Sequence, residues 1–318
     1  MACTLHPVEI ICGLAQHVKA AVTPHLGTWR ARRVTGIAAS GDATFDIDEI
    51  AEQAVSQYLV ENEVNVAYYS EDRGLVHPLG GSEPEGILII DPIDGTRGAI
   101  AGFEACVVSV AWTAFKAQPV LSDVQYAALA EIKGSRLFLA ERGAGTQIRE
   151  ADGSSVPAAL SPQTEIPGMA WATEVVGAPV DLVFKALGGF ASQTTVRGGL
   201  FILNSSAFEL TRLVSGQLAA VVDIRNRLLR SHPQLKPTFT EYGGGRLLSL
   251  YGYDIAAAAL VVQEAGGIVT DAWGRSLANW NLLDTTEANF GSLVACANAE
   301  LHSKLMAEID ASFANLTL

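Results

Sequence analysis

Cysteine and histidine are scarce in this sequence and form no metal-binding pattern. Among 318 residues there are four cysteines without a C-x-x-C pair and six histidines without an H-x-x-x-H pair. Zinc sites draw on closely spaced cysteine and histidine ligands, so we expect no zinc site. Cys12, Cys106 and Cys296 lie in apolar runs, which predicts reduced core residues in a cytoplasmic protein.

Long apolar runs are also missing. The most apolar stretch, residues 105–115, is too short to span a bilayer and is broken by Ser109 and Thr113. Residues 1–6 contain no basic region and Glu9 follows closely, a pattern unlike that of a signal peptide. We therefore expect no membrane among the partners of this chain.

Positive charge is in the minority. The sequence has 21 Lys and Arg against 34 Asp and Glu, a formal net charge of −13 at pH 7, which argues against a nucleic-acid polymer as a partner. A small anionic substrate is still compatible with this charge, because a bound cation can invert the local field. Hydrophobic residues make up 49% of the sequence, enough for the core of one large or two moderate domains.

Two carboxylates mark the abrupt end of an apolar run. Residues 87–90 are typical of a buried strand, and Asp91-Pro92-Ile93-Asp94-Gly95-Thr96 follows directly. Pro92 turns the chain, Gly95 permits close approach of a ligand to the backbone, and Thr96 is suited to begin a helix. Carboxylates attract a hard cation, and the free N–H groups of a helix start attract a phosphate. Taken alone, the same residues are equally typical of an ordinary turn.

The motif Asp91–Thr96 resembles the signature of the metal-dependent, lithium-sensitive phosphatases, the superfamily of inositol monophosphatases, fructose-1,6-bisphosphatases and 3′-phosphoadenosine nucleotide phosphatases. Three further segments match that superfamily in the same order, namely Asp42–Asp48, Ser70–Asp72 and Tyr253–Gly267. The similarity covers nearly the whole chain, from about residue 8 to about residue 300. It implies the superfamily's α/β layered sandwich, with layers in the order α-β-α-β-α. A homodimer is also expected.

Strand and helix patterns alternate along both halves of the chain, which by itself indicates layered α/β structure. Helices are expected at 8–22, 47–59, 182–187, 207–214, 255–265 and 300–313 and from residue 96 onward, and strands at 65–69, 87–91, 105–114, 119–126, 136–140, 169–176, 219–222, 267–270 and 293–296. Residues 149–168 are rich in Gly, Ser, Pro and Ala. We interpret them as a linker between an N-terminal α+β domain, 1–148, that carries the metal site and a C-terminal α/β domain, 169–318, that completes it.

The resemblance implies which residues hold metal. Glu71, Asp91 and the main-chain carbonyl of Ile93 would hold a first ion, and Asp91, Asp94 and Asp254 a second; Asp72 is an alternative to Glu71. Oxygen-only ligand sets of this kind favour Mg²⁺, with Mn²⁺ as an alternative.

The resemblance also implies catalytic and substrate-binding residues. Thr96 would hydrogen-bond the nucleophilic water, Asp48 would orient Thr96, and Glu71 would share in catalysis. The substrate would contact Asp94, Gly95, Thr96, Arg97, Ser205, Ser206, Asp223 and Arg225, with the N–H groups of Gly95 and Thr96 on the phosphate. Some assignments have ordinary alternatives: Asp48 as a partner of its helix dipole, Asp223 as a turn residue, and Arg225, with Arg227 and Arg230, as a solvated basic patch.

The sequence departs from the superfamily pattern near the substrate and not at the metal ligands. Arg97-Gly98 stands where Asn-Phe is common, Asn204–Ala207 replaces a Gly-Ser/Thr-Ala segment, and the segment 226–252 is longer than usual. Prolines and a triple glycine within that segment argue against one continuous helix. We expect it to form a flap over the substrate side of the cleft, with a packed structural arm as the alternative.

These patterns predict a Mg²⁺-dependent, lithium-sensitive phosphomonoesterase in which metal-activated water attacks a small polyol or sugar phosphate, of the inositol monophosphate or fructose 1,6-bisphosphate type. A nucleotide phosphatase acting on 3′-phosphoadenosine 5′-phosphate or AMP is the alternative, because Arg97-Gly98 is mildly similar to the Lys-Gly of nucleotide-acting members. A non-catalytic binding protein on the same fold is an alternative of another class. It would require the loss of a metal ligand, and none is lost.

Overall fold

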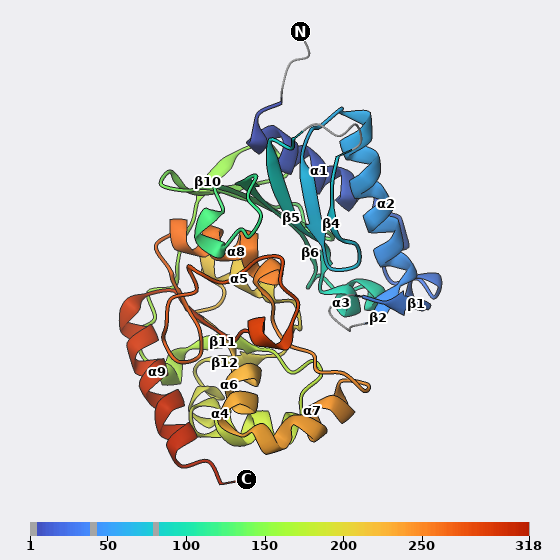
Figure 1. Cartoon of the computed structure of the whole chain (residues 1–318). Helices are drawn as coiled ribbons and strands as arrows, with labels where there is room; N and C mark the ends of the chain where they lie inside the picture. Colours follow the sequence, from blue (N-terminus) through green and yellow to red (C-terminus); the bar gives the residue numbers. More distant parts are fainter. Residues whose placement is uncertain (1–4, 39–42, 79–82, 318) are drawn as a thin grey trace.

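The computed structural model describes residues 5–38, 43–78 and 83–317. Within these ranges the chain forms two large sheets that alternate with three layers of helices (Figure 1). The expected α-β-α-β-α sandwich is therefore confirmed. Asp42, the first residue of the early acidic segment, lies outside the described residues.

The elements of the described residues have the following bounds. The helices are α1 (Pro7–Val22), α2 (Asp46–Glu61), α3 (Thr96–Ala101), α4 (Val180–Thr194), α5 (Ser206–Val214), α6 (Arg225–Ser231), α7 (Lys236–Tyr242), α8 (Gly252–Glu264) and α9 (Ala299–Ala314). Strands β1 (Val34–Ile37) and β2 (Ala43–Phe45) form a hairpin. An eight-stranded sheet, in the order β10-β9-β8-β7-β6-β5-β3-β4, contains β3 (Ala67–Ser70), β4 (Gly74–Val76), β5 (Gly86–Asp94), β6 (Val107–Ala114), β7 (Tyr126–Glu131), β8 (Leu137–Glu141), β9 (Gly145–Arg149) and β10 (Ser155–Pro157). A five-stranded sheet, in the order β12-β11-β13-β15-β14, contains β11 (Ala170–Thr173), β12 (Gly199–Phe201), β13 (Ala220–Asp223), β14 (Ile268–Thr270) and β15 (Leu293–Cys296).

Helix α1 begins at a capping box. The His6 N–H donates to Glu9 Oε2 at 2.9 Å, the Val8 N–H donates to His6 Nδ1 at 3.3 Å, and Pro7 occupies the first turn. The apolar stripe of α1 then packs with α2 against the outer face of the large sheet. Local capping and a single apolar face are thus enough to place this first layer.

Residues 87–90 of strand β5 are all apolar because both faces of the strand are covered. Leu88 and Ile90 point into the core beneath α1 and α2, whereas Ile87 and Ile89 point into the core between the two sheets. Alternate residues of a strand point to opposite faces, so one short run serves two cores. β5 lies between β6 and β3 inside the sheet, and its end carries the carboxylates of the motif into the interior of the molecule.

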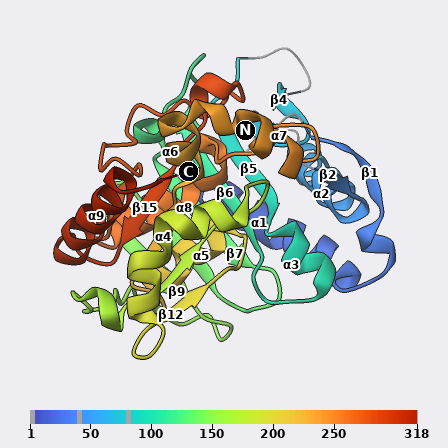
Figure 2. The same ribbon diagram turned by 90° about the horizontal axis from the view of Figure 1, so that it is seen from below.

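Helices α5 and α8 form the middle layer, between the two sheets (Figure 1). Residues 255–262 of α8 are all buried, in accordance with a helix that is apolar on every side. The far face of the smaller sheet is covered by α4 and α9, which lie nearest the viewer in Figure 2. There the ring of Trp171 packs 4.9 Å from that of Phe190.

Several predicted elements need correction. The strand expected at 119–126 is wrong: Leu121–Asp123 is a short 3₁₀ turn in which Asp123 Oδ2 accepts from the Val120 N–H at 2.9 Å, and the strand begins only at Tyr126. An acidic side chain that bonds to nearby backbone competes with strand pairing, which explains the difference. The helix expected at 182–187 extends over Val180–Thr194, and β12, α6 and α7 were not predicted.

The stretch 149–168 is not wholly irregular. Ser155–Pro157 forms β10, which pairs antiparallel with β9 and extends the large sheet. In addition, α5 and α8 from the second half of the chain pack against strands of the first half. The division into two domains joined by this stretch stays a prediction.

The described cysteines, Cys12, Cys106 and Cys296, are unpaired. Cys106 and Cys296 are fully buried, as predicted, whereas Cys12 is only partly buried and packs against the edge of the core. In the part of the chain that the structure describes, every helix is too short or too polar to cross a membrane.

Glu52 of α2 is buried and makes the structure sensitive to pH. Its Oε2 lies 3.3 Å from Arg73 Nε, and burial raises the pKa of Glu52 from 4.5 to about 7. The folded state therefore holds this proton more tightly than the unfolded state does. It follows that the stability contributed by Glu52 is lost as the pH rises from about 4.5 through about 7.

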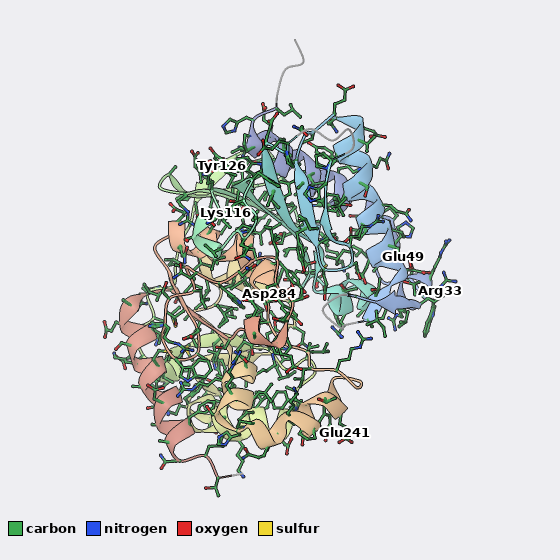
Figure 3. The ribbon with its side chains drawn as sticks, viewed as in Figure 1. Arg33, Glu49, Lys116, Tyr126, Glu241 and Asp284 are labelled. Atoms are coloured by element: carbon green, nitrogen blue, oxygen red, sulfur yellow. The ribbon has the colours of Figure 1, made fainter. Side chains whose placement is uncertain are left out.

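We expect Glu52→Gln to remove this loss. Urea unfolding in EDTA should show the variant gaining stability over the wild type between pH 5 and pH 8, by up to about 3 kcal/mol. Glu49 lies one turn earlier on the same helix with its side chain in solvent (Figure 3), so Glu49→Gln is the matched control and should show no such pH-dependent gain. Parallel stability curves for Glu52→Gln and the wild type would contradict the prediction.

Candidate active site

A polar hollow lies where the ends of several elements meet. Its acidic lining comes from four places in the fold: Glu71 after β3, Asp91 and Asp94 in β5, Glu174 after β11, and Asp254 in the first turn of α8. These residues are separated by up to 183 positions in the sequence, the difference between 71 and 254. The hollow is thus a product of the layered fold as a whole.

An irregularity in β5 turns Asp91 and Asp94 toward the same side. Asp91 pairs with Ser109 of β6 and Asp94 with Val107, so three steps along β5 match two steps along β6. Without an extra residue, positions three apart would point to opposite faces of the sheet. The bulge, at which Pro92 lies, restores a common direction and lets both carboxylates line the hollow.

Gly95 makes the turn from β5 into α3 possible. Its φ is +90°, and a Cβ atom at this position would collide with the carbonyl oxygen of Ala105 and with Ser205. Only glycine meets both conditions without strain. Helix α3 then begins at Thr96, as predicted, beside the carboxylates.

Asp94 is held by the N-terminus of α5. Its Oδ2 accepts from the Ser205 hydroxyl at 2.6 Å, from the Ala207 N–H at 2.7 Å and from the Phe208 N–H at 3.1 Å. Three donors on one oxygen fix the orientation of the carboxylate. Ser205, predicted to contact substrate, therefore supports Asp94 and does not line the hollow itself.

Asp254 and Asp48 each cap their own helix in the same manner. Asp254 Oδ2 accepts from the Tyr251 N–H at 2.7 Å, and Asp48 Oδ2 accepts from the Phe45 N–H at 2.8 Å. In both cases one carboxylate oxygen is committed to the helix start. The side chains are therefore oriented before any ligand is bound.

The predicted pairing of Thr96 with Asp48 is present. Thr96 Oγ1 lies within hydrogen-bond distance of Asp48 Oδ1, at 3.1 Å, and of the carbonyl oxygen of Ile93, at 3.0 Å. Both potential partners are acceptors, so the hydroxyl proton is directed inward. The lone pairs of Oγ1 are then available to accept a hydrogen bond from a bound water.

The hollow concentrates negative charge. Burial raises the pKa values of Asp91 and Asp254 well above their usual range, and the other carboxylates of the hollow raise them further. Burial also raises the pKa of Asp94, to about 6, against the effect of its three donors. A cation placed among these groups would favour their ionised forms.

The donor set has the chemistry that Mg²⁺ requires, since all the ligating atoms would be oxygens. Among the described residues, however, no group of three or more His, Cys, Asp or Glu side chains is already gathered closely enough to hold an ion. Glu71 is only partly buried, so rotation of its side chain can bring its oxygens toward the fixed carboxylates of Asp91, Asp94 and Asp254. The residues present therefore fit a metal centre that assembles when the ion binds.

Arg225 and Asp223 form a buried ion pair at the back of the hollow. Arg225 Nη2 donates to Asp223 Oδ2 at 2.7 Å and Nε donates to Oδ1 at 3.0 Å, while Nη1 donates to the Val176 carbonyl at 2.6 Å. Arg225 lines the hollow, but Asp223 is fully buried behind it. Asp223 thus positions Arg225, and the two residues are not part of a solvated basic patch.

Most of the predicted site residues come together. The hollow is lined by Glu71, Asp91, Ile93, Asp94, Gly95, Thr96, Arg97, Ser206, Arg225 and Asp254. A smaller recess that shares Glu71, Asp91 and Thr96 with it is lined in addition by Asp48 and Asp72. Ser205 and Asp223 stand behind the lining.

Sequence reasoning missed Glu174. This residue is buried, lines the hollow, and has its pKa raised to about 7 by burial; its Oε1 accepts from the Ser206 hydroxyl at 3.3 Å. A usable signal was present, because Glu174 directly follows a strand just as Glu71 does. The strand predicted at 169–176 was too long and included Glu174, whereas β11 ends at Thr173, one residue before it.

The segment 226–252 borders the hollow only at its end. Two short helices, α6 and α7, are anchored by the buried side chains of Leu228 and Phe239, and residues 248–251 then line the hollow. The segment is not one continuous helix, as predicted. Its buried anchors agree with the packed arm better than with the flap.

Comparison with known proteins agrees with this geometry. The sequence profile of the inositol monophosphatase family matches residues 5–313. A protein of Methanothermobacter thermautotrophicus called fructose-1,6-bisphosphatase/inositol-1-monophosphatase is 29% identical over 301 residues, which cover 93% of this chain and 94% of that protein. Its namesake in Thermococcus kodakarensis is also 29% identical, over 303 residues that cover 94% of this chain and 95% of the relative.

Solved structures share the fold. The Thermotoga maritima IMPase superposes with a TM-score of 0.66 at 19% identity, covering 94% of this chain and 95% of its own. The extragenic suppressor protein SuhB of Bartonella henselae superposes with a TM-score of 0.68 at 18% identity, covering 95% and 97%. With a family profile that spans almost the whole chain and the acidic motifs meeting in one hollow, this chain belongs to the inositol monophosphatase family.

Proposed function

We propose that this protein is a Mg²⁺-dependent phosphomonoesterase that hydrolyses a small polyol or sugar phosphate. The observation that carries the proposal is the convergence of Glu71, Asp91, Asp94 and Asp254 on one hollow beside the Thr96–Asp48 pair. Family membership and relatives named fructose-1,6-bisphosphatase/inositol-1-monophosphatase support it. Neither the nucleotide phosphatase nor the non-catalytic binding protein is favoured by these observations.

The residues of the hollow would have the following roles. Glu71, Asp91, Asp94, Asp254 and the carbonyl of Ile93 would hold Mg²⁺, with Mn²⁺ as a substitute. When bound, the metal lowers the pKa of water and stabilises the charge of the leaving oxygen. Thr96 Oγ1, with its own proton directed to Asp48, accepts a hydrogen bond from the attacking water and orients it. The N–H groups of Gly95 and Thr96 donate to the phosphate.

Substrate selection would rest on the wall opposite the motif. Arg225 presents a cation held rigidly by Asp223, and Ser206 and Glu174 offer a hydroxyl and a carboxyl group to substrate hydroxyls. Arg97, exposed at the rim, suits a second anionic group. These groups suit a polyhydroxylated phosphate. Tyr251 and Tyr253 also line the hollow and supply the apolar face that a nucleobase would need, so a panel of esters decides between the two substrate classes.

Phosphate release from a panel of esters tests the proposal. We expect turnover of inositol 1-phosphate or fructose 1,6-bisphosphate that is lost in excess EDTA, restored by Mg²⁺ or Mn²⁺, and inhibited by Li⁺ at constant ionic strength. The physical reason is that the carboxylates repel the substrate phosphate unless cations separate them. Full turnover in EDTA would contradict the metal mechanism, and a more than tenfold preference in kcat/KM for 3′-phosphoadenosine 5′-phosphate or AMP would contradict the substrate class.

We also propose a cytoplasmic homodimer. Trp29 and Phe103 have 85% and 65% of their surface exposed, on segments joined by a hydrogen bond from the Gly27 N–H to the Ala99 carbonyl. Large exposed apolar side chains on neighbouring segments suit a protein interface. Light scattering after size exclusion measures the mass directly, and a monomer at micromolar concentration would contradict this part of the proposal.

A further inference from the structure

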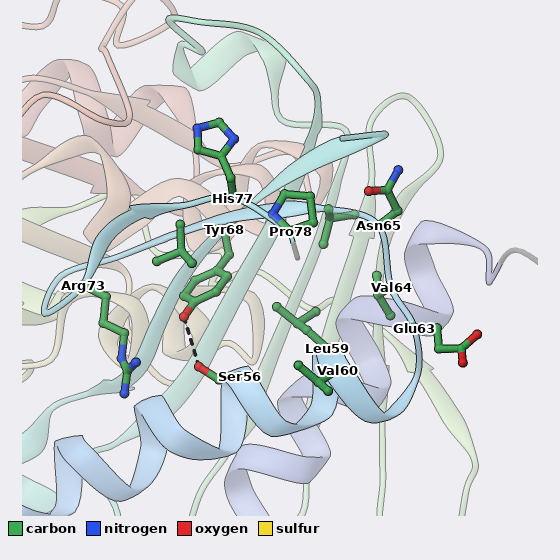
Figure 4. Close-up of a pocket in the computed structure, with 12 residues that line it drawn as sticks. Ser56, Leu59, Val60, Glu63, Val64, Asn65, Tyr68, Arg73, His77 and Pro78 are labelled. Atoms are coloured by element: carbon green, nitrogen blue, oxygen red, sulfur yellow. Dashed lines mark hydrogen bonds between the residues drawn. The ribbon is translucent and has the colours of Figure 1, made fainter. Parts of the chain in front are cut away.

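A second and larger pocket lies on the other side of the β3–β4 hairpin from the metal ligands. It is a partly open cavity between this hairpin and the C-terminal half of α2 (Figure 4), and its lining includes Ser56, Leu59, Tyr68, Arg73, Val76 and His77. We call it the hairpin pocket. Its volume of about 480 Å³ falls in the range of small-molecule sites. Nothing in the proposed phosphatase mechanism uses it.

The walls of the hairpin pocket are mainly apolar, and its charges are unevenly placed. Side chains of Leu59 and Val60 rise from α2 toward the ring of Tyr68, whose hydroxyl lies 3.1 Å from Ser56 Oγ (Figure 4). Arg73 and His77 flank the two ends of β4. Arg73 is the cation at one end of the pocket, where its Nε lies 3.3 Å from Glu52 Oε2, and Glu63 is the acidic side chain of the lining.

We infer that the hairpin pocket binds a small molecule that has an apolar ring body and one anionic group, with the anion at Arg73. The cavity volume and the aliphatic walls suit the ring body. The guanidinium of Arg73 suits a carboxylate, sulfonate or phosphate. The hydroxyl pair of Ser56 and Tyr68 can in addition donate to, or accept from, one polar atom of the ligand.

Occupancy of the hairpin pocket is coupled to the metal site, a step that rests on the proposed function. Arg73 is two residues beyond Glu71, its N–H donates to Ser70 Oγ at 3.3 Å, and Asp72 Oδ1 accepts from the Thr44 hydroxyl at 2.5 Å. A ligand that holds Arg73 therefore orders the turn that presents Glu71. The turn that carries Glu71 then loses less conformational entropy when Mg²⁺ binds, so the ligand raises the affinity for Mg²⁺. By linkage, Mg²⁺ raises the affinity for the ligand by the same factor.

The fluorescent probe 8-anilinonaphthalene-1-sulfonate (ANS) has the required chemistry and tests the site. Titration of the whole folded protein should give one binding site. Val76→Trp, which fills the pocket, should weaken binding at least about tenfold. Leu75 is the neighbouring residue on β4, is not part of the pocket lining and points to the opposite face, so Leu75→Trp is the matched control and should bind as the wild type does. Equal binding by the two variants, or displacement of ANS by inorganic phosphate with Mg²⁺, would overturn the proposal.

The anionic end is tested separately. The double variant Glu52→Gln with Arg73→Gln removes both members of an ion pair in which Glu52 is buried and Arg73 is exposed, so no buried carboxylate is left without its partner. It should weaken ANS binding several-fold and leave binding of the neutral dye Nile red unchanged. If ANS and Nile red weaken equally, the pocket does not recognise an anion and that part of the proposal fails.

The coupling is tested by calorimetric titration of Mg²⁺ with and without saturating ANS. We expect ANS to tighten Mg²⁺ binding by at least about threefold in the wild type and to have no effect in Val76→Trp. An unchanged Mg²⁺ affinity in the wild type would refute the coupling and leave the ligand site standing. Absence of any Mg²⁺ binding would instead refute the metal site, and with it the coupling, so the two failures are distinguishable.

Discussion

Replacing Asp94 by asparagine should abolish phosphate release while leaving the protein folded. Asparagine still presents an oxygen to the three donors that hold Asp94, Ser205 and the Ala207 and Phe208 N–H groups. It lacks the negative charge that a metal ion needs from this position. We expect kcat to fall by at least about 10³-fold, measured as phosphate released from the best ester of the panel at saturating Mg²⁺.

The stability of the Asp94→Asn variant provides its first control. Burial raises the pKa of Asp94 to about 6, so the ionised carboxylate is unfavourable in the metal-free protein at neutral pH. In EDTA the variant should therefore unfold at the same urea concentration as the wild type or a higher one. Asp271→Asn is the matched substitution, since Asp271 is also buried and accepts the Trp273 and Arg275 N–H groups at 2.8 Å, outside the hollow. It should keep full activity; retained activity in Asp94→Asn would contradict the metal assignment.

Removing the hydroxyl of Thr96 should slow the chemical step selectively. Thr96→Ala deletes the oxygen that lies 3.1 Å from Asp48 Oδ1 and leaves the backbone N–H in place for the phosphate. We expect kcat to fall about 10²–10³-fold, with KM and Mg²⁺ affinity changed much less. Steady-state kinetics over a range of Mg²⁺ concentrations separates these quantities.

A conservative variant distinguishes chemistry from packing at this position. Thr96→Ser keeps Oγ and should retain activity within about tenfold of the wild type, whereas Thr96→Val keeps the shape without the hydroxyl and should resemble Thr96→Ala. Asp48→Asn should lower kcat in the wild-type protein. In the Thr96→Ala variant the same substitution should have little further effect on kcat, because the two residues act as a unit. Additive losses in that double variant would mean that Asp48 acts by another route.

Local patterns in the sequence determine a large part of the fold. The run 87–90 is apolar at every position, and a strand buried on both faces requires this. The all-apolar stretch of α8 likewise predicts a helix enclosed on every side, and α8 lies between the two sheets. Pro92 and Gly95 indicate a sharp turn next to Asp91 and Asp94, which the structure realises as a bulge followed by α3.

Other features depend on contacts between distant segments, and the sequence alone did not reveal them. Asp94 is oriented by the start of α5, 111 positions away; Asp223 is turned away from the hollow because Arg225 folds back on it; and Glu174 joins the site because β11 lies next to β13 in the smaller sheet. The anchoring of α6 and α7 by Leu228 and Phe239 has the same origin. Local turns and apolar strand and helix patterns follow from short-range geometry, so the sequence by itself determined them, and the resemblance to the phosphatase superfamily implied the metal ligands. Which carboxylate faces the ligand and which is satisfied inside the protein depends on the partners that burial supplies, and only the tertiary structure decided that.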